Sequence, residues 1–514
     1  VVELAAGLSE LGWELVSSGG TAAALREAGL AVADTAEITG FPAILGHRVV
    51  TLHPKVHGGI LADRTDPAHR ADLEAHGIAP FDLVVVNLYP FGAEAATFEH
   101  GASQAEELID IGGPALVRAA AKNHTQVGVV VDPADYEPVL DELRSDGSLS
   151  AATRRSLARR AFARTAAYDA AIVGWFDDTA RPGPAELPES LHLTYRREPL
   201  ALRYGENPHQ RAALYRAGAT GAGAGAAGPW WVAMTQHGGM ALSYLNLYDA
   251  DAAWLLVHDL AARFGRPAAA IIKHANPCGA AIAPTLADAY QHAFECDERS
   301  AFGGIVAVSG TVDQPSVERM VAAAQADVVI APGYGPGTIE ALQVKRKNTR
   351  ILEAPAPIPD RWHLRPITGG LLLQDPHRFV AERAGWRVVT RREPTEAEWS
   401  DAELAWRVCG WVRSNAIVLA RGGAAWGIGA GQQNRVESGE LAASKAAGRA
   451  AGGACASDAF YPFPDGIEAA AAAGVAVVIQ PGRPAGVSRD EEIIARADEL
   501  GLAMVFTGER HFLH

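Results

Sequence analysis

The amino-acid sequence predicts an α/β protein with at least two domains, and three observations carry that prediction. Strand-like and helix-like segments alternate in the first third of the chain and again after residue 228, which favours parallel strands flanked by helices. The chain has 514 residues, more than one hydrophobic core usually serves. Apolar residues make up 48% of the chain, which is enough to fill well-buried cores.

Short apolar runs and helical patterns organise the first third. The strand-like runs lie at residues 14–17, 48–52, 83–88 and 127–131. Helices are predicted over residues 21–28 and 157–175. Residues 181–188 contain three prolines, which regular elements exclude, and they predict a linker. We therefore expect a first domain at residues 1–185, a linker at 186–200 and a second domain at 201–514.

The alternation resumes after a glycine-alanine tract at residues 217–228, which predicts a flexible surface insertion. Thr285 followed by Asp288 predicts a capped helix that ends near Cys296. Further strands are expected at residues 304–308, 328–330, 476–479 and 503–507, and further helices at 317–325 and 489–500. The chain shows no short-period repeat.

The composition argues against several classes of protein. A net charge of −15 disfavours bulk nucleic-acid binding, although it is compatible with a local basic pocket for a small anion. No apolar run is long enough to cross a bilayer, and we expect no secretory signal. The four cysteines are far apart, with no Cys-x-x-Cys pair. This spacing argues against a disulfide framework and a cysteine-based zinc site, and it favours a cytoplasmic location.

The most informative stretch is Lys273-His274-Ala275-Asn276-Pro277, which follows an apolar run that predicts a buried strand. We expect the strand to deliver Lys273 and His274 side by side into an Asn-Pro turn. The neighbouring cation disfavours the imidazolium, so the ring can accept a proton while the lysine steadies a developing negative charge. From these residues alone, a surface lysine beside a turn-stabilising histidine is an equal alternative.

Three motifs in the first third are open to two interpretations. Ser18-Gly19-Gly20-Thr21 lies between a strand and a helix, which suits either a phosphate loop or a plain turn. His53 and His57 are four residues apart, but Pro54 and the glycines after His57 oppose the helix that a zinc pair needs. Asp110 and Lys122 supply a carboxylate and an amine, and each alone suits an ordinary turn or helix end.

The second half carries further polar motifs. Residues 202–210 gather Arg, Tyr, Asn and His around a turn, which favours a binding loop over a plain polar loop. Residues 427–435 are glycine-rich but match neither the dinucleotide fingerprint nor the P-loop. Residues 457–465 suit either a flat heterocycle or packing on the core. A zinc-deaminase site at His274 and Cys278 is disfavoured, because Asn276 replaces the glutamate of that motif and no second cysteine follows.

Ordered motifs along nearly the whole chain resemble one family. They include SGGTAAALREAGL, ITGFPAILGHRVVTLHPKVHGGIL, VVVNLYPF, IDIGGPALVRAAAKNH, LRYGENPHQ, IIKHANPCG, ECDERSAFGGIVA, GIGAGQQNRV, ASDAFYPFPDG and TGERHFLH. The family comprises the bifunctional purine biosynthesis enzymes, which combine phosphoribosylaminoimidazolecarboxamide (AICAR) formyltransferase with IMP cyclohydrolase. The resemblance implies an N-terminal, doubly wound domain of methylglyoxal-synthase-like fold. It also implies a C-terminal transformylase domain of two cytidine-deaminase-like subdomains without zinc.

The resemblance implies a reaction and its partners as well. Members transfer a formyl group from the co-substrate 10-formyltetrahydrofolate to AICAR, and then close formyl-AICAR to IMP with loss of water. These are the last two steps of de novo purine biosynthesis, and no metal is required. The implied partners are these small molecules and a second copy of the chain, since members are typically homodimers with transformylase sites at the subunit interface. No nucleic-acid or membrane partner is implied.

Individual roles are carried over by position in the motifs. The implied catalytic residues are Lys273, His274 and Asn415 for formyl transfer, and Tyr89, Asp110 and Lys122 for ring closure. The residues implied to hold the nucleotide are Arg203, Tyr204, Asn246, Asp327, Arg435, Phe460 and His514. Phe302 and Asp465 resemble folate-pocket residues, and Arg510 resembles a phosphate or partner-site residue. Ser18, Gly19, Gly20 and Thr21 match the phosphate loop of the cyclohydrolase domain.

The chain departs from the family pattern chiefly in its first domain. Val50 stands where the family has a lysine assigned to ring closure. The family also begins with a strand and a phosphate-contacting loop that precede the first residue here. An alternative is therefore a transformylase whose cyclohydrolase domain is impaired by Val50 and by the missing segment. In the second domain Met240 and Leu245 replace a lysine and an asparagine of the family, while Lys273, His274 and Asn415 are retained.

Overall fold

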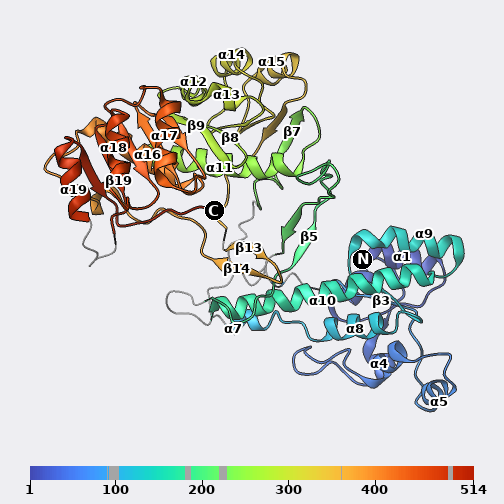
Figure 1. Cartoon of the computed structure of the whole chain (residues 1–514). Coiled ribbons are helices and arrows are strands. Elements are labelled where there is room, and N and C mark those ends of the chain that lie inside the picture. The colour runs from blue at the N-terminus through green and yellow to red at the C-terminus, as the bar shows by residue number, and fades with distance from the viewer. Residues whose placement is uncertain (89–90, 92–102, 180–186, 219–227, 361, 484–489) are drawn as a thin grey trace. The chain divides into compact units, whose positions relative to one another are not determined.

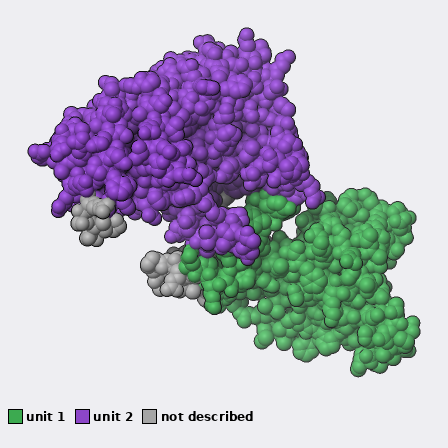
Figure 2. Space-filling view, in the orientation of Figure 1, with its two compact units in different colours: residues 1–196, 215–224 green, residues 197–214, 225–514 purple. Residues whose placement is uncertain are grey.

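The computed structural model describes residues 1–514 except 89–90, 92–102, 180–186, 219–227, 361 and 484–489. The chain divides into two compact units (Figure 2). Unit 1 comprises residues 1–196 and 215–224, and unit 2 comprises residues 197–214 and 225–514. Most of the predicted linker core at 181–188 and of the predicted insertion at 217–228 lies outside the described residues. The predicted domain limits at residues 185 and 200 stay predictions.

Unit 1 contains two pairs of parallel strands among its described residues. Strand β1 (Val16–Ser17) pairs with β2 (Ala33–Asp34), and β3 (Leu83–Val85) pairs with β4 (Gly128–Val130). The helices are α1 (Val2–Glu10), α2 (Gly19–Glu27), α3 (Thr35–Thr39), α4 (Pro54–Leu61), α5 (Pro67–Ala75), α7 (Ser103–Glu106), α8 (Gly112–Lys122), α9 (Tyr136–Asp146) and the long α10 (Ala151–Thr179), with a short 3-10 turn at Pro133–Asp135 (Figure 1). Val117 of α8, Val129 of β4 and Leu157 of α10 are buried in one core.

Two local expectations in unit 1 are wrong. Residues 48–52 form no strand; Val49 makes only an isolated bridge with Ile44. Pro54 does not prevent a helix but begins one, because proline lacks only an N–H that the first helical turn leaves unpaired. His53 precedes this helix, and its Nδ1 accepts the backbone N–H of Lys55 at 3.1 Å.

Unit 2 is built on a twelve-stranded mixed sheet, with the order β15-β20-β19-β18-β16-β17-β9-β8-β10-β11-β12-β7. Its first half contains β7 (Thr235–Gly238), α11 (Tyr244–Phe264), β8 (Ala268–Lys273), β9 (Asn276–Ile282), α12 (Leu286–Cys296), α13 (Glu298–Ala301), β10 (Ile305–Val308), α14 (Gln314–Ala322), β11 (Val328–Ala331), α15 (Thr338–Lys345) and β12 (Arg350–Glu353). Its second half contains β15 (Arg387–Val388), α16 (Glu396–Gly410), β16 (Ile417–Arg421), β17 (Ala424–Gly429), α17 (Arg435–Ala446), β18 (Ala454–Ser457), α18 (Asp465–Ala472), β19 (Val477–Gln480), α19 (Asp490–Glu499) and β20 (Ala503–Phe506).

The two halves of this sheet repeat one arrangement of elements. Each half runs strand, helix, β-hairpin, and then helices alternating with three strands. The last three strands are parallel in each half, whereas the hairpins β8-β9 and β16-β17 are antiparallel and lie at the centre of the sheet. Helices α11 and α16 share one core through the fully buried Trp254 and Trp406. The predicted two-subdomain architecture is thus visible as a repeat in the topology.

The remaining described strands form small pairs. They are β5 (Tyr195–Arg197) with β6 (Tyr215–Ala217), and the hairpin β13 (His363–Ile367) with β14 (Gly370–Gln374). The predicted helix cap is confirmed, since the Thr285 hydroxyl accepts the backbone N–H of Asp288 at 3.1 Å at the start of α12. Among the described helices, none combines the length and the apolar character needed to cross a membrane.

Candidate functional site

Lys273 and His274 lie at the tip of the central hairpin β8-β9. Lys273 pairs with Asn276, so the two-residue turn consists of His274 and Ala275. Their φ angles are +56° and +55°, the combination that a type I′ turn requires. The prediction of an Asn-Pro turn is therefore wrong by two residues, because Asn276 and Pro277 already belong to β9.

Hydrogen bonds join this turn to its surroundings. The Lys273 ammonium donates to the backbone carbonyl of Phe302 at 2.8 Å, which leaves two of its three donors for a ligand. The Asn276 side chain donates to the carbonyl of His274 at 3.3 Å and accepts the backbone N–H of Arg413 at 3.0 Å. Asn276 thereby ties the His274 turn to the segment that leads into β16.

Asn415 lies in that same segment. Its backbone N–H and its side-chain amide both donate to the carbonyl of Gln432, at 3.1 Å and 2.9 Å. The neighbouring Ser414 donates its backbone N–H to the carbonyl of Leu513 at 2.9 Å. The structure thus brings Lys273, His274, Asn415 and the C-terminal tail into one hydrogen-bonded neighbourhood.

A buried ion pair lies beside Asn415. The Arg435 guanidinium is 2.6 Å from the Asp458 carboxylate, whose side chain is 0% exposed. Burial raises the pKa of Asp458, while the charge of Arg435 and the hydroxyl of Ser414, 2.5 Å away, act in the opposite direction. This network holds Arg435 at the start of α17, next to the Asn415 segment.

A second cluster contains Arg203, Tyr204, Asp327 and Arg350. The Arg203 guanidinium lies 5.1 Å from the centre of the Tyr204 ring. Burial lowers the pKa of Arg350, and the nearby Arg203 lowers it further, while Asp327 opposes the shift. Two arginines and one carboxylate leave a net positive site, which suits a phosphate or another anion.

Asn246 lies in the first turn of α11. Its side chain accepts the backbone N–H of Ser243 at 3.0 Å, completing a capping box. The backbone of Tyr244 donates to the carbonyl of Tyr204 at 3.4 Å. Helix α11 therefore begins beside the second cluster, and one turn later Asp249 contacts the His274 turn. Helix α11 thus connects the cluster of Arg203 and Arg350 with the His274 turn.

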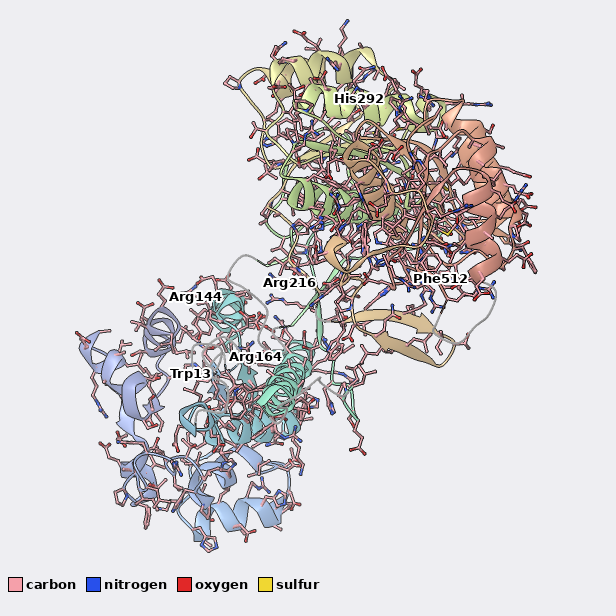
Figure 3. All side chains as sticks on the ribbon, turned by 90° about the vertical axis from the view of Figure 1, so that its left-hand side faces the viewer. Trp13, Arg144, Arg164, Arg216, His292 and Phe512 are labelled. Carbon is pink, nitrogen blue, oxygen red and sulfur yellow. The ribbon has the colours of Figure 1, made fainter. Side chains whose placement is uncertain are left out.

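Other predicted residues lie in the tail and in surrounding loops. The Arg510 guanidinium lies 4.4 Å from the ring centre of Phe512, whose position Figure 3 marks, and Arg365 donates to the carbonyl of His514. Phe460 packs under the Arg483 guanidinium at 4.8 Å. Phe302 is 64% exposed. Asp465 opens α18, where its carboxylate accepts the N–H of Gly466 at 2.7 Å.

In unit 1 the predicted phosphate loop forms the start of α2. Helix α2 begins at Gly19, whose φ is +55°, and the Ser18 hydroxyl makes no capping bond. Asp110 precedes α8 and accepts the N–H of Gly113 at 2.9 Å, whereas Lys122 ends this helix. The ten steps from Gly112 to Lys122 separate these helix ends by about 15 Å. The structure therefore does not bring Asp110 and Lys122 together, and Tyr89 lies outside the described residues.

Thr51, the neighbour of Val50, lies at the Asp110 end of α8. Its hydroxyl is 3.0 Å from where a Cβ on Gly112 would stand. Lys55, the nearest lysine in sequence, donates to the carbonyl of Ile38 at 3.2 Å. Thr51, the neighbour of the position where the family has lysine, thus lies at the Asp110 end of α8, and Lys55 is bonded elsewhere.

The cysteines offer no reactive thiolate. All four are buried and unpaired, and burial raises the pKa of Cys278 to about 12. Across the part of the chain that the structure describes, no group of three or more His, Cys, Asp or Glu side chains is arranged to hold a metal ion.

Sequence reasoning missed two residues of this neighbourhood, Asp249 and Arg350, whereas Asp458 lies in the motif at residues 457–465. Each is a charged residue that is less than a tenth exposed. A buried charge requires a partner, so a lone Asp or Arg within an apolar segment is a usable signal. Asp249 and Arg350 carry no such signal, because Asp251 follows Asp249 closely within α11 and the polar residues 345–349 precede Arg350.

The chain matches known proteins over its whole length. A family model described as MGS-like domain matches residues 1–115, and one described as AICARFT/IMPCHase bienzyme matches residues 120–445. The "Bifunctional purine biosynthesis protein PurH" of Dinoroseobacter shibae is 48% identical, covering 100% of this chain and 96% of its own length. Proteins of the same name from Ruegeria pomeroyi and Bacillus subtilis are 49% and 45% identical, covering 100% and 99% of this chain and 96% of their own lengths. The family predicted from the motifs is confirmed, and the chain belongs to the AICARFT/IMPCHase bienzyme family.

Proposed function

We propose that the chain transfers a formyl group from 10-formyltetrahydrofolate to the 5-amino group of AICAR, and then closes formyl-AICAR to IMP with loss of water. One observation carries the first step: Lys273 and His274 share a hairpin tip that is hydrogen-bonded to the Asn415 segment. The chain also matches, over its full length, relatives whose name calls them bifunctional. The second step rests on that full-length match and on the MGS-like unit.

In the proposed formyl transfer, the amine nitrogen of AICAR attacks the formyl carbon of the folate. A C–N bond forms, and the carbonyl oxygen acquires negative charge, which the Lys273 ammonium stabilises with its remaining donors. His274 accepts the proton that the amine loses. The bond from the formyl carbon to N10 of the folate then breaks, and N10 receives the proton. Asn415 contributes its amide to the same centre.

We assign substrate-holding roles by combining position and charge. The positive cluster around Arg203 and Arg350 suits the phosphate of the nucleotide, and Tyr204, Asn246, Asp327, Arg435, Phe460 and His514 complete that site. The exposed ring of Phe302 and the carboxylate of Asp465 are assigned to the folate pocket. We propose a homodimer located in the cytoplasm, with Arg510 at the phosphate or the partner site.

Ring closure is assigned to unit 1. The carboxamide nitrogen of formyl-AICAR attacks the formyl carbon, and the formyl oxygen leaves as water with one proton from that nitrogen and one from the formamide nitrogen. The N-terminus of α2, with Ser18, Gly19, Gly20 and Thr21, suits the phosphate. Asp110, Tyr89 and Lys122 stay the predicted catalytic residues. Both steps are retained in the proposal despite Val50, because nothing in the full-length match to bifunctional relatives favours a single activity.

The two activities separate in single variants. His274→Gln should lower the rate of formyl transfer by about 10²–10⁴, and Lys273→Met by about 10²–10³. Ring closure of supplied formyl-AICAR should be unchanged in both, because that step is assigned to unit 1. His76→Gln, an exposed histidine after α5, is the matched control. Formyl transfer at the unsubstituted rate in His274→Gln would refute the assignment.

A further inference from the structure

Unit 2 contains two β-hairpins at corresponding places in its repeated halves. In β8-β9, the pair Lys273–Asn276 closes a turn of His274 and Ala275. In β16-β17, the pair Arg421–Ala424 closes a turn of Gly422 and Gly423, with φ angles of +61° and +86°. Both turns are two residues long, with positive φ at both positions, as type I′ turns have.

Each turn is held by an aspartate from the helix that precedes its hairpin. Asp249 is the sixth residue of α11, and Asp401 is the sixth residue of α16. The Asp249 carboxylate accepts the backbone N–H of His274 at 3.1 Å and of Ala275 at 2.8 Å. The Asp401 carboxylate accepts the backbone N–H of Gly422 at 2.7 Å and bonds Gly423 as well. The same device thus occurs twice in the chain.

The two turns differ in what the backbone requires. Glycine adopts positive φ without steric cost, so Gly422 and Gly423 suit their turn unaided. A residue with a Cβ is sterically disfavoured in the left-handed region, and His274 and Ala275 both lie there. The hairpin that carries the proposed proton acceptor is therefore the one that depends on its aspartate.

The environment of Asp249 suits this role. Its carboxylate is buried, and burial raises its pKa, while the two backbone N–H donors of the turn act against that shift. A buried carboxylate with two backbone donors has a fixed position. The turn is fixed with it, and so is the imidazole that the turn presents.

We propose that Asp249 is the positioning residue for His274: it holds the strained His274-Ala275 turn and so sets where the imidazole stands against the AICAR amine. The inference rests on the proposed function of His274. Asp249 touches neither substrate in this account and acts only through the turn. Asp401 performs the same structural task where no chemistry is assigned.

The test compares matched variants of the full-length protein. Asp249→Asn replaces one acceptor oxygen by a donor, and should lower kcat of formyl transfer about 10- to 100-fold, with KM for AICAR changed less than threefold. Asp401→Asn makes the same change at the glycine turn and should leave kcat within twofold. Adding Ala275→Gly to Asp249→Asn should recover at least half of the lost kcat on a logarithmic scale, because glycine relieves the turn. Asp249→Glu, a milder change that keeps the charge but displaces the carboxylate, should also lower kcat.

Hydrogen–deuterium exchange supplies a readout independent of turnover. Exchange in peptides covering residues 268–282 should rise in Asp249→Asn and not in Asp401→Asn. Equal losses of kcat in both variants, no recovery with Ala275→Gly, or full activity in Asp249→Glu would each overturn the positioning role. An inactive unsubstituted enzyme, with the exchange difference intact, would instead refute the proposed function.

Discussion

Lys273 and His274 are adjacent in sequence but are held in different ways. The Lys273 ammonium is held by one carbonyl, that of Phe302, and keeps donors free. His274 is held through its backbone, by Asp249 and Asn276, which leaves its ring available. The buried strand that leads to this pair was predicted correctly, and the catalytic roles of the pair stay predictions. The sequence could not predict the holding residues, because Asp249 is 25 positions away and meets the turn only in the folded sheet.

Val50 is the residue whose replacement tests the cyclohydrolase half. Its neighbour Thr51 approaches Gly112 at the Asp110 end of α8. Stabilising charge at a reacting centre is typically worth about 10²–10³ in rate. Val50→Lys should therefore raise the rate of ring closure from supplied formyl-AICAR by up to about a hundredfold. Formyl transfer serves as the internal control. An unchanged ring-closure rate would show that ring closure in this chain does not depend on a lysine at position 50.

At the scale of elements, patterns with strong local signals were predicted well. The Thr285 cap, strand β11 and helix α19 lie within one or two residues of their predicted positions. The apolar run at 48–52 was misread, because its residues pack in a turn with Val49 bridging Ile44 and not in a ladder. The left-handed backbone at His274 and Ala275 was also missed, since the Asn-Pro pair that follows favoured a turn two residues later and alanine carries no local signal for positive φ.

The C-terminal tail is an element whose anchoring depends on two histidines. His377 and His511 lie 2.8 Å apart, with the Trp406 ring 5.0 Å from His511. The pKa of both histidines is lowered to about 4, chiefly by burial. The neighbouring His511 adds to the lowering at His377, and Arg407 does the same at His511. The tail also binds the Asn415 segment, through Leu513.

This pair predicts a pH dependence of stability. Unfolded histidine binds a proton near pH 6.5, whereas the folded pair binds it only near pH 4. Between these values the unfolded state binds more protons, so the free energy of unfolding should fall as pH is lowered from 6.5 to 4, by at most about 1.4 kcal/mol per pH unit for each histidine. Urea midpoints at pH 7.5 and 5.0 should differ less in His377→Gln than in the unsubstituted protein. The exposed His76→Gln should keep the original difference, and an identical dependence in His377→Gln would contradict the account.

At the scale of the molecule, the two subdomains of unit 2 were expected from the family resemblance, whereas their repeated element order is visible only in the structure. The two halves share an element order, capping boxes at Ser243 and Thr395, and aspartates at equivalent helix positions. Their side chains differ enough that no short-period repeat is readable. The formyl-transfer centre assigned here draws on both halves, since His274 comes from the first and Asn415 from the second. Formyl transfer and ring closure should therefore both be measured on the intact chain.

The most direct measurement gives the purified full-length protein AICAR and 10-formyltetrahydrofolate, and quantifies formyl-AICAR and IMP separately over time. Formyl-AICAR should form first and IMP should follow. In His274→Gln both products should form about 10²–10⁴ times more slowly, and IMP formation should be restored when formyl-AICAR is supplied. Formyl-AICAR without IMP would contradict the second activity. Failure to form formyl-AICAR in a folded protein that binds AICAR would contradict the assignment of formyl transfer to this chain.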